Sequence, residues 1–362
     1  MKSDAVLRAS LPTLFAVLVL TAVAATLTPE RAPRREAPPP TARAASPATL
    51  DVLPARLSEL GLFVDLPALR PAPGVEAYDV RYPLWSDGAE KPRHLRLPEG
   101  GRLASDGEGG FHFPEGSTFS KTFVAPADAG AASGRKLETR ILHKNAERWL
   151  TGAYVWNEAG DDADLTDGWD RTLPLRLPGC DADYVVPGRV SCLQCHAGAG
   201  DMVLGFSAPQ LGTAKLGELA ARGRLEAPVR EIPHAEFEAE SDVERDALGY
   251  LEGNCAHCHN PRSSAFAGAQ LDLRAFKAKE AIGRPAFRLA HESARHVVAA
   301  GKPEASTLYR LFVRTLAPEF DQKRMPPVGA HSVDPHGRAV LERWIESLAV
   351  PEGARESVHR SE

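Results

Sequence analysis

The sequence predicts a multidomain α+β protein, with an N-terminal β-sandwich or barrel-like domain at residues 49–188 and a mainly α-helical region after it. Two observations carry this prediction. Short alternating or aromatic-rich runs, separated by Gly, Pro and Asp clusters, fill residues 50–188 and are typical of strands. Apolar residues at helical spacing recur in the C-terminal third. The chain of 362 residues is long enough for two or three domains.

The N-terminus has the pattern of a secretory signal peptide at residues 1–27. A weakly basic start precedes an apolar run from residue 11, and small residues follow at 22–24. We therefore expect export, with the folded part in the periplasm. The alternative is an uncleaved inner-membrane anchor that faces the periplasm, because the apolar stretch of about 17 residues reaches the lower limit for spanning a bilayer.

Composition limits the kinds of partner. Residues 28–48 are rich in proline, alanine and charge, which predicts a disordered linker. The whole chain has 43 Lys and Arg against 48 Asp and Glu, a formal net charge of −5. This mild acidity gives no nucleic-acid footprint, and it suits docking to a partner with a basic face.

The β-rich domain is predicted to contain several short strands. We expect them at residues 75–82, 111–113, 118–124, 136–142 and 148–156. The last two are predicted to form a hairpin that turns at residues 144–147. No long helical periodicity interrupts these runs, which favours a sandwich or an open barrel. The domain carries no recognisable catalytic motif.

Two short cysteine motifs are the most specific signal in the chain. Each pair of cysteines stands three positions apart and is followed directly by a histidine, in Cys192-Leu193-Gln194-Cys195-His196 and in Cys255-Ala256-His257-Cys258-His259. Each is a C-x-x-C-H signature for covalent attachment of haem c. Two thiols reach the two vinyl groups of one porphyrin, and the adjacent imidazole becomes the proximal iron ligand. The sequence thus predicts two covalently attached haem c groups, with His196 and His259 as metal ligands.

Other uses of paired cysteines fit less well. Structural zinc pairs usually lie about 15–20 residues apart, whereas 59 residues separate Cys195 from Cys255 and a histidine follows both pairs. A thioredoxin-like dithiol is expected near a βαβ pattern, which neither pair has. The fifth cysteine, Cys180, is either a buried inert thiol or a partner for another chain.

The C-terminal region, residues 241–350, is expected to place the second motif among helices. A capping box at residues 241–244 starts one helix. Pro303 is suited to the first turn of another, and Asp334 precedes a last helix with an apolar stripe. A short tail follows at residues 351–362.

Met325 is the predicted sixth ligand of the second haem iron. It stands in a proline-held loop, 66 positions beyond His259. A thioether there completes a His/Met iron, which raises the reduction potential relative to two imidazoles. The alternative is a methionine that only fills a gap in the core.

The first haem-binding segment, residues 189–240, is too short for a complete cytochrome fold, so the β-rich domain is expected to help enclose this haem. Met202 lies six residues after His196, a span of at most about 20 Å, and would be a strained sixth ligand. The other candidates are histidines, namely His94, His112, His143 and His234. The sequence does not choose among them.

These motifs together resemble a known family. The helix, C-x-x-C-H, M-P-P loop and W-I-containing last helix resemble a class I cytochrome c domain, which implies a mainly α-helical cytochrome c region. The wider pattern resembles a family of exported dihaem c-type cytochromes with an N-terminal β domain. Besides the two haem motifs, it consists of P-L-W-S-D-G-A-E-K (83–91), F-P-E-G-S-T-F-S-K-T-F (113–123), L-E-T-R-I-L (137–142) and Y-V-W-N (154–157). The resemblance implies electron transfer and assigns no physiological partner.

Three functional hypotheses follow. The first is a periplasmic dihaem c-type cytochrome that carries electrons between other redox proteins. The second is an enzyme of the dihaem peroxidase or oxidase kind, which needs one iron with an open sixth site and a nearby acid or base. The third is a β substrate-binding module with an attached cytochrome as electron acceptor. The residues favour the electron carrier, and no catalytic residue is assigned.

Overall fold

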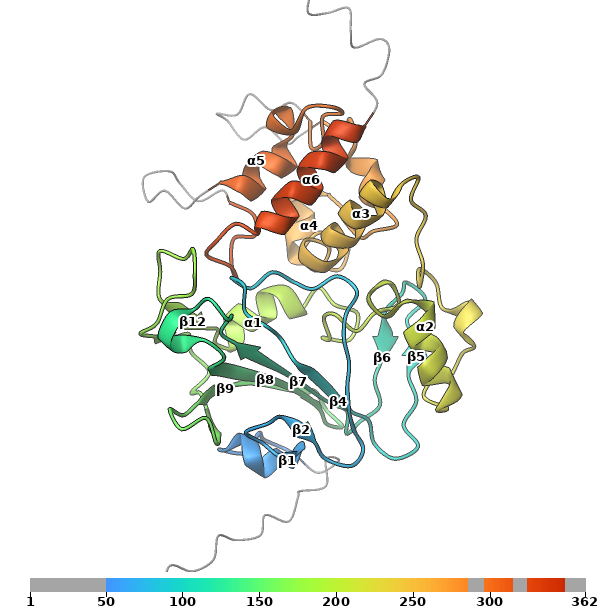
Figure 1. Cartoon of the computed structure of the whole chain (residues 1–362). Helices are drawn as coiled ribbons and strands as arrows, with labels where there is room; N and C mark the ends of the chain where they lie inside the picture. Colours follow the sequence, from blue (N-terminus) through green and yellow to red (C-terminus); the bar gives the residue numbers. More distant parts are fainter. Residues whose placement is uncertain (1–49, 286–295, 315–323, 349–362) are drawn as a thin grey trace, which may run out of the picture. The chain divides into compact units, whose positions relative to one another are not determined.

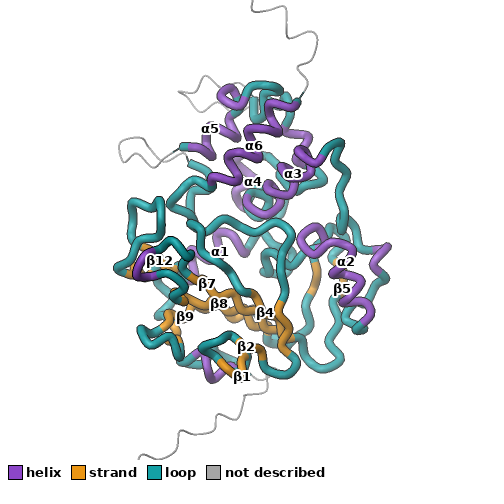
Figure 2. Tube along the Cα trace, in the orientation of Figure 1, coloured by secondary structure: helices purple, strands orange, loops and turns teal. Residues whose placement is uncertain are grey.

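The computed structural model describes residues 50–285, 296–314 and 324–348. The predicted signal peptide, linker and tail lie outside these residues. Along the chain, a region of strands precedes a region of helices, as Figure 1 and Figure 2 show. The α+β prediction is therefore confirmed at this coarse level. Among the described helices, none is long and apolar enough to cross a membrane.

The β region is built from short strands. Their bounds are β1 Phe63–Asp65, β2 Arg70–Pro71, β3 Val75–Ala77, β4 Arg93–Arg96, β5 Ala104–Ser105, β6 Phe111–His112, β7 Thr118–Val124, β8 Lys136–Lys144, β9 Trp149–Trp156, β10 Ala163–Leu165, β11 Arg171–Leu173 and β12 Tyr184–Val186. The main antiparallel sheet has the order β10-β9-β8-β7-β4-β3. The other described strands pair two by two, as β1-β2, β5-β6 and β11-β12.

The main sheet is open, so the prediction of a sandwich or barrel-like domain is wrong in its detail. One face is covered by the segment that includes the 3₁₀ helix Leu57–Leu60, which packs on Ile141 and Tyr154. The opposite face packs through Leu95 and Phe119 against Phe206 and apolar residues of helix α2. Because non-strand segments bury both faces, the sheet needs neither closure nor a second large sheet.

The hairpin of β8 and β9 is confirmed. Its turn is closed by a hydrogen bond from the Asn145 N–H to the Arg148 carbonyl, 3.0 Å long. The first predicted strand ends early, at Ala77, because the chain then leaves the sheet to contact the start of α2. There the N–H of Arg81 donates to the Gln210 carbonyl, 2.9 Å away.

The helices are α1 Arg189–His196, α2 Ala208–Ala221, α3 Asp242–Asn254, α4 Ser264–Ala269, α5 Thr307–Val313 and α6 Pro335–Ser347. The three predicted C-terminal helices are found as α3, α5 and α6, although Pro303 opens a 3₁₀ turn that precedes α5. Sequence patterns missed α1, because this helix buries none of its residues and therefore has no apolar stripe.

The caps of α3 and α6 agree with their sequences. The Ser241 hydroxyl accepts from the N–H of Glu244 at 3.2 Å, while the Glu244 carboxylate reaches one residue further back than a capping box requires, to the N–H of Glu240. Asp334 accepts from the N–H of His336 at 2.9 Å.

Helices α3 and α6 form the core of the C-terminal region. A Cβ at Gly337 would overlap the Tyr250 ring, so this glycine permits the close approach of the two helices. The buried side chains around their contact include Leu248, Leu251, Leu341, Trp344 and Ile345.

Candidate functional site

One cavity contains the second cysteine motif and Met325 together. Cys255, Cys258, His259 and Met325 all line a space of about 280 Å³. The rest of its wall is largely apolar and includes Leu271, Leu273, Leu308, Leu311 and Phe312. Two thiols, an imidazole and a thioether around an apolar space are the donor set of a His/Met haem c site. These residues therefore fit the group that the sequence predicts.

Local structure explains how the second motif is placed. Helix α3 ends at Asn254, and the motif continues as a tight turn in which the His259 N–H donates to the Cys255 carbonyl at 2.9 Å. The His259 carbonyl in turn accepts from the N–H of Leu273 at 2.8 Å. Burial lowers the pKa of His259, with the charge of His257 as a further cause. The imidazole is therefore neutral at pH 7, which is the form that binds a metal.

The Met325 loop is held by hydrogen bonds to its backbone groups. The Met325 N–H donates to the Leu311 carbonyl at 3.0 Å. The buried Arg324 guanidinium donates to the carbonyls of Ala330 and His331, at 2.7 and 3.0 Å. The Met325 side chain itself remains 37 % exposed. One edge of the predicted iron-ligand site is thus open to solvent.

Asp87 connects the β region to this loop. Its carboxylate accepts hydrogen bonds from the N–H of His331 at 2.8 and 3.0 Å, from the N–H of Ser332 at 2.8 Å, and from the Ser332 hydroxyl at 2.7 Å. Burial opposes ionisation, but the His331 imidazole, whose Nδ1 lies 3.4 Å from the carboxylate, and the bonds above prevail. Together they lower the pKa of Asp87 to about 2. No sequence pattern singles out Asp87 beyond its place in the segment 83–91.

The same segment also contacts helix α3 and the second cavity. The N–H of Trp85 donates to the Asn254 side chain at 2.7 Å, directly before the motif. The Trp85 indole donates to the Ser332 carbonyl at 3.2 Å. Leu84 and Trp85 also line the cavity of the second motif. Segment 83–91 therefore ties together both chain segments that supply the predicted iron ligands.

The first motif lies at the end of α1, against the main sheet. Its Cys192 and His196 line a cavity of about 40 Å³ with residues of β7, β8 and β9. The His196 Nδ1 lies 2.7 Å from the Met202 carbonyl, so Nδ1–H donates and Nε2 is left to bind a metal. Burial, and next the charge of Lys121, lower the pKa of His196 to about 3. The ligand chemistry fits a haem, but this cavity is far smaller than the cavity that contains the second motif.

The four histidines proposed as sixth ligand of the first haem do not line this cavity. His94 and His143 lie on the opposite face of the sheet from Lys121, where they face Ser120 and Thr118. The His112 side chain is exposed, and the His234 ring stacks on Phe276 with 3.5 Å between centroids. A one-residue step along a strand reverses the face of a side chain, which sequence alone did not resolve here.

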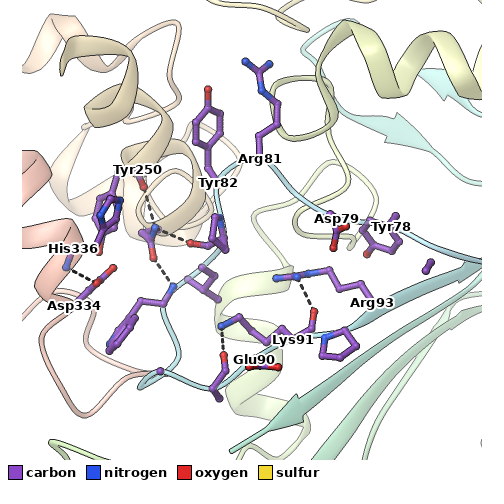
Figure 3. Close-up of a pocket in the computed structure, with 18 of the residues that line it drawn as sticks. Tyr78, Asp79, Arg81, Tyr82, Glu90, Lys91, Arg93, Tyr250, Asp334 and His336 are labelled. Carbon is purple, nitrogen blue, oxygen red and sulfur yellow. Dashed lines mark hydrogen bonds between the residues drawn. The ribbon is translucent and has the colours of Figure 1, made fainter. Parts of the chain in front are cut away.

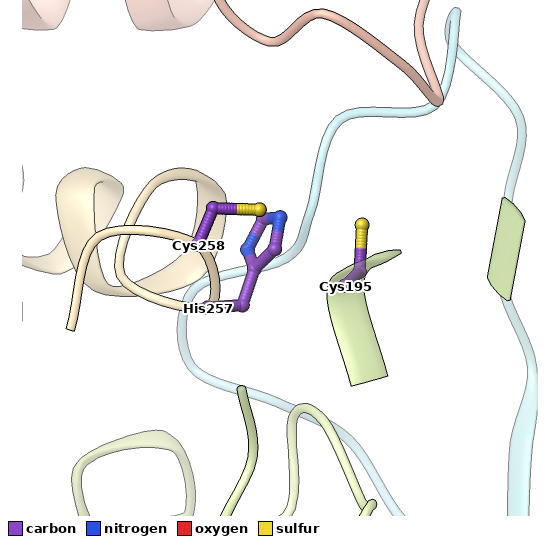
Figure 4. A group of neighbouring side chains, drawn as sticks. All are labelled: Cys195, His257 and Cys258. Carbon is purple, nitrogen blue, oxygen red and sulfur yellow. The ribbon is translucent and has the colours of Figure 1, made fainter. Parts of the chain in front are cut away.

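The two cysteine motifs lie side by side. Ligand atoms of Cys195, His257 and Cys258 are all within 4.8 Å of one another, and Figure 4 shows the three side chains. A hydrogen bond between the two thiols lowers the pKa of Cys195 and raises that of Cys258. Three ligands are one short of the closed four-ligand set of structural zinc sites. The first cysteines of both motifs, Cys192 and Cys255, stand outside the cluster.

Two other features lie away from these motifs. Burial raises the pKa of Cys180 to about 11, which keeps this thiol protonated and poorly reactive at neutral pH. A cavity of about 830 Å³, shown in Figure 3, lies between residues 77–94 and helices α3 and α6. Its lining includes Tyr78, Glu90 and Lys91 but none of the motif cysteines.

Comparisons with known proteins add no assignment: no family model, curated protein or solved structure matches the chain.

Proposed function

We propose that the protein is an exported, periplasmic dihaem c-type cytochrome that carries electrons between other redox proteins. The observation that carries this proposal is the cavity shared by Cys255, Cys258, His259 and Met325. Four potential haem-binding side chains converge there, although Met325 is distant from the others in sequence. A haem iron held by these residues would accept and release one electron, and its His/Met ligands would favour the reduced state relative to two imidazoles.

The contact between the two motifs supports electron transfer within the chain. Cys195 and Cys258 would each carry one edge of a haem, and their sulfur atoms lie within 4.8 Å of each other. Two redox groups attached there would have adjacent edges. The Met325 side chain is 37 % exposed, so one edge of a haem held in this cavity would be open to a redox partner.

Mass spectrometry of the denatured, full-length holoprotein tests this function. We expect two covalent haems per chain, and substitution of Cys255 and Cys258 by serine should remove one of them. A mass without haem, together with zinc or another metal retained by the native protein, would contradict the proposal. That result would instead assign a metal site to Cys195, His257 and Cys258.

A dihaem peroxidase or oxidase is the second candidate, and one observation favours it. Within the described residues, none of the four candidate histidines lines the small cavity of the first motif with His196. A haem there would keep an open sixth position. Carbon monoxide separates the candidates: the carrier should bind it poorly after reduction and reduce peroxide negligibly. Fast stoichiometric binding at one haem, with steady peroxide turnover, would favour the enzyme.

A further inference from the structure

Three basic side chains form a row across the main sheet. Arg93 on β4 lies directly opposite Lys121 on β7, and Lys121 lies directly opposite Arg140 on β8. Directly opposed residues of antiparallel strands point to the same face. Like charges in such positions repel one another and destabilise the sheet. The row therefore needs negative charge nearby.

The described protein supplies only part of that charge. Glu138 is fully buried and holds Arg140 through two hydrogen bonds of 2.6 and 2.9 Å. Arg93 donates to the Lys91 carbonyl at 2.8 Å, and Figure 3 shows these two residues together. Near Arg93, Lys91 adds one positive charge and the exposed Asp79 adds one negative charge, so these two cancel.

Lys121 is the member of the row that lacks an anionic partner. Among the described residues its ammonium forms no hydrogen bond or ion pair, and it lies 5.5 Å from the centroid of the Phe123 ring. A half-buried cation between two other cations is costly unless a ligand compensates it.

The row faces the first cysteine motif. Lys121 and Arg140 line the small cavity that contains Cys192 and His196. Lys121 and Arg93 also line another cavity, of about 140 Å³, beside residues 198–207, which follow the first motif. The unbalanced positive charge thus lies where a group attached to α1 would contact the sheet.

We propose that Arg93, Lys121 and Arg140 bind the two carboxylates of the porphyrin attached at Cys192 and Cys195. This inference depends on the proposed function. Glu138 compensates one of the three charges of the row, and the two propionate groups of a haem would compensate the other two. Arginine can bind a carboxylate through two parallel hydrogen bonds, and lysine adds a point charge between the arginines.

The test uses full-length holoprotein, in which mass spectrometry counts both haems. A wild-type protein without two haems would refute the proposed function, and this count detects that outcome separately. Lys121→Gln removes the central charge, and Lys121→Arg retains it. Lys136→Gln is the matched control, because Lys136 lies on β8 but packs over Trp156 and donates to the Pro67 carbonyl. The reduction potentials of both haems are measured by optical titration.

We expect Lys121→Gln to lower the equilibrium constant for reduction of one haem about tenfold, which is about 59 mV for one electron. In this variant, the equilibrium constant for reduction of the other haem should stay within threefold of the wild-type value. In Lys121→Arg and Lys136→Gln, both constants should stay within threefold. Equal potentials in Lys121→Gln and wild type would overturn the proposal. Carbon monoxide binding in both Lys121 variants, but not in the wild type, would also overturn it and assign Lys121 as an iron ligand. A shift of the wild-type potential on adding succinate would show that the row is open to external carboxylates instead.

Discussion

Replacing Asp87 by asparagine is expected to loosen the loop that carries Met325. Asparagine is the appropriate change because Asp87 has a φ of 52°, a conformation that asparagine tolerates better than alanine does. The variant retains one acceptor oxygen but loses the charge that serves the N–H groups of His331 and Ser332. Hydrogen bonds to a charged group contribute about 1.5–3 kcal/mol each. We expect the free energy of unfolding to fall by about 2 kcal/mol at pH 7.

Because the pKa of Asp87 is lowered in the folded protein, the effect of Asp87→Asn on the free energy of unfolding should depend on pH. The folded pKa of Asp87 is about 2, below the ordinary value of 3.8 for this carboxyl group. Since each tenfold change in acidity is 1.36 kcal/mol, this difference corresponds to at most about 2.4 kcal/mol, and screening by solvent reduces it to about 1–2 kcal/mol. A lowered folded pKa stabilises the protein above the unfolded pKa. This contribution is therefore present above about pH 4 and is lost as the pH falls towards 2.

Chemical unfolding followed by far-UV circular dichroism measures both effects. The control is Asp128→Asn, which changes an exposed aspartate in the β region. Asp87→Asn should have a lower unfolding midpoint than this control at pH 7, and the gap should narrow between pH 4 and 2. Equal midpoints at pH 7 would refute the role given to Asp87. A gap that stays constant down to pH 2.5 would refute its electrostatic origin.

Two further changes probe the C-terminal region. Met325→His should abolish the weak absorption band near 695 nm that resemblance to His/Met cytochromes implies. It should also lower the potential of one haem, since an imidazole favours the ferric state more than a thioether does. Met202→Leu is the control, and loss of the band in Met202→Leu alone would assign Met202, not Met325, as the ligand. Ser241→Ala should reduce the free energy of unfolding by about 1 kcal/mol, because the N–H of Glu244 loses its cap. Ser241→Gly should reduce it by only a few tenths of a kcal/mol, and equal losses in both variants would show that the cap is not the cause.

The features that could be predicted from the sequence are those with a local cause. Strand β7 has the predicted bounds, 118–124, because alternation within seven residues is enough to define it. The α3 cap at Ser241 and the α6 cap at Asp334 likewise depend on groups within three positions. Helix α1 has no such local signal, since it buries no side chain of its own.

The sequence by itself determined the two C-x-x-C-H motifs, whose thiols and imidazole lie within five positions and need no fold to be recognised. Only the tertiary structure decided that Cys195 and Cys258 meet, that Asp87 ties down the loop of Met325, and that Lys121 rather than His143 faces the first motif. The physical reason is that each of these facts depends on the pairing of distant segments. In a sheet, the register of that pairing sets which face every side chain takes.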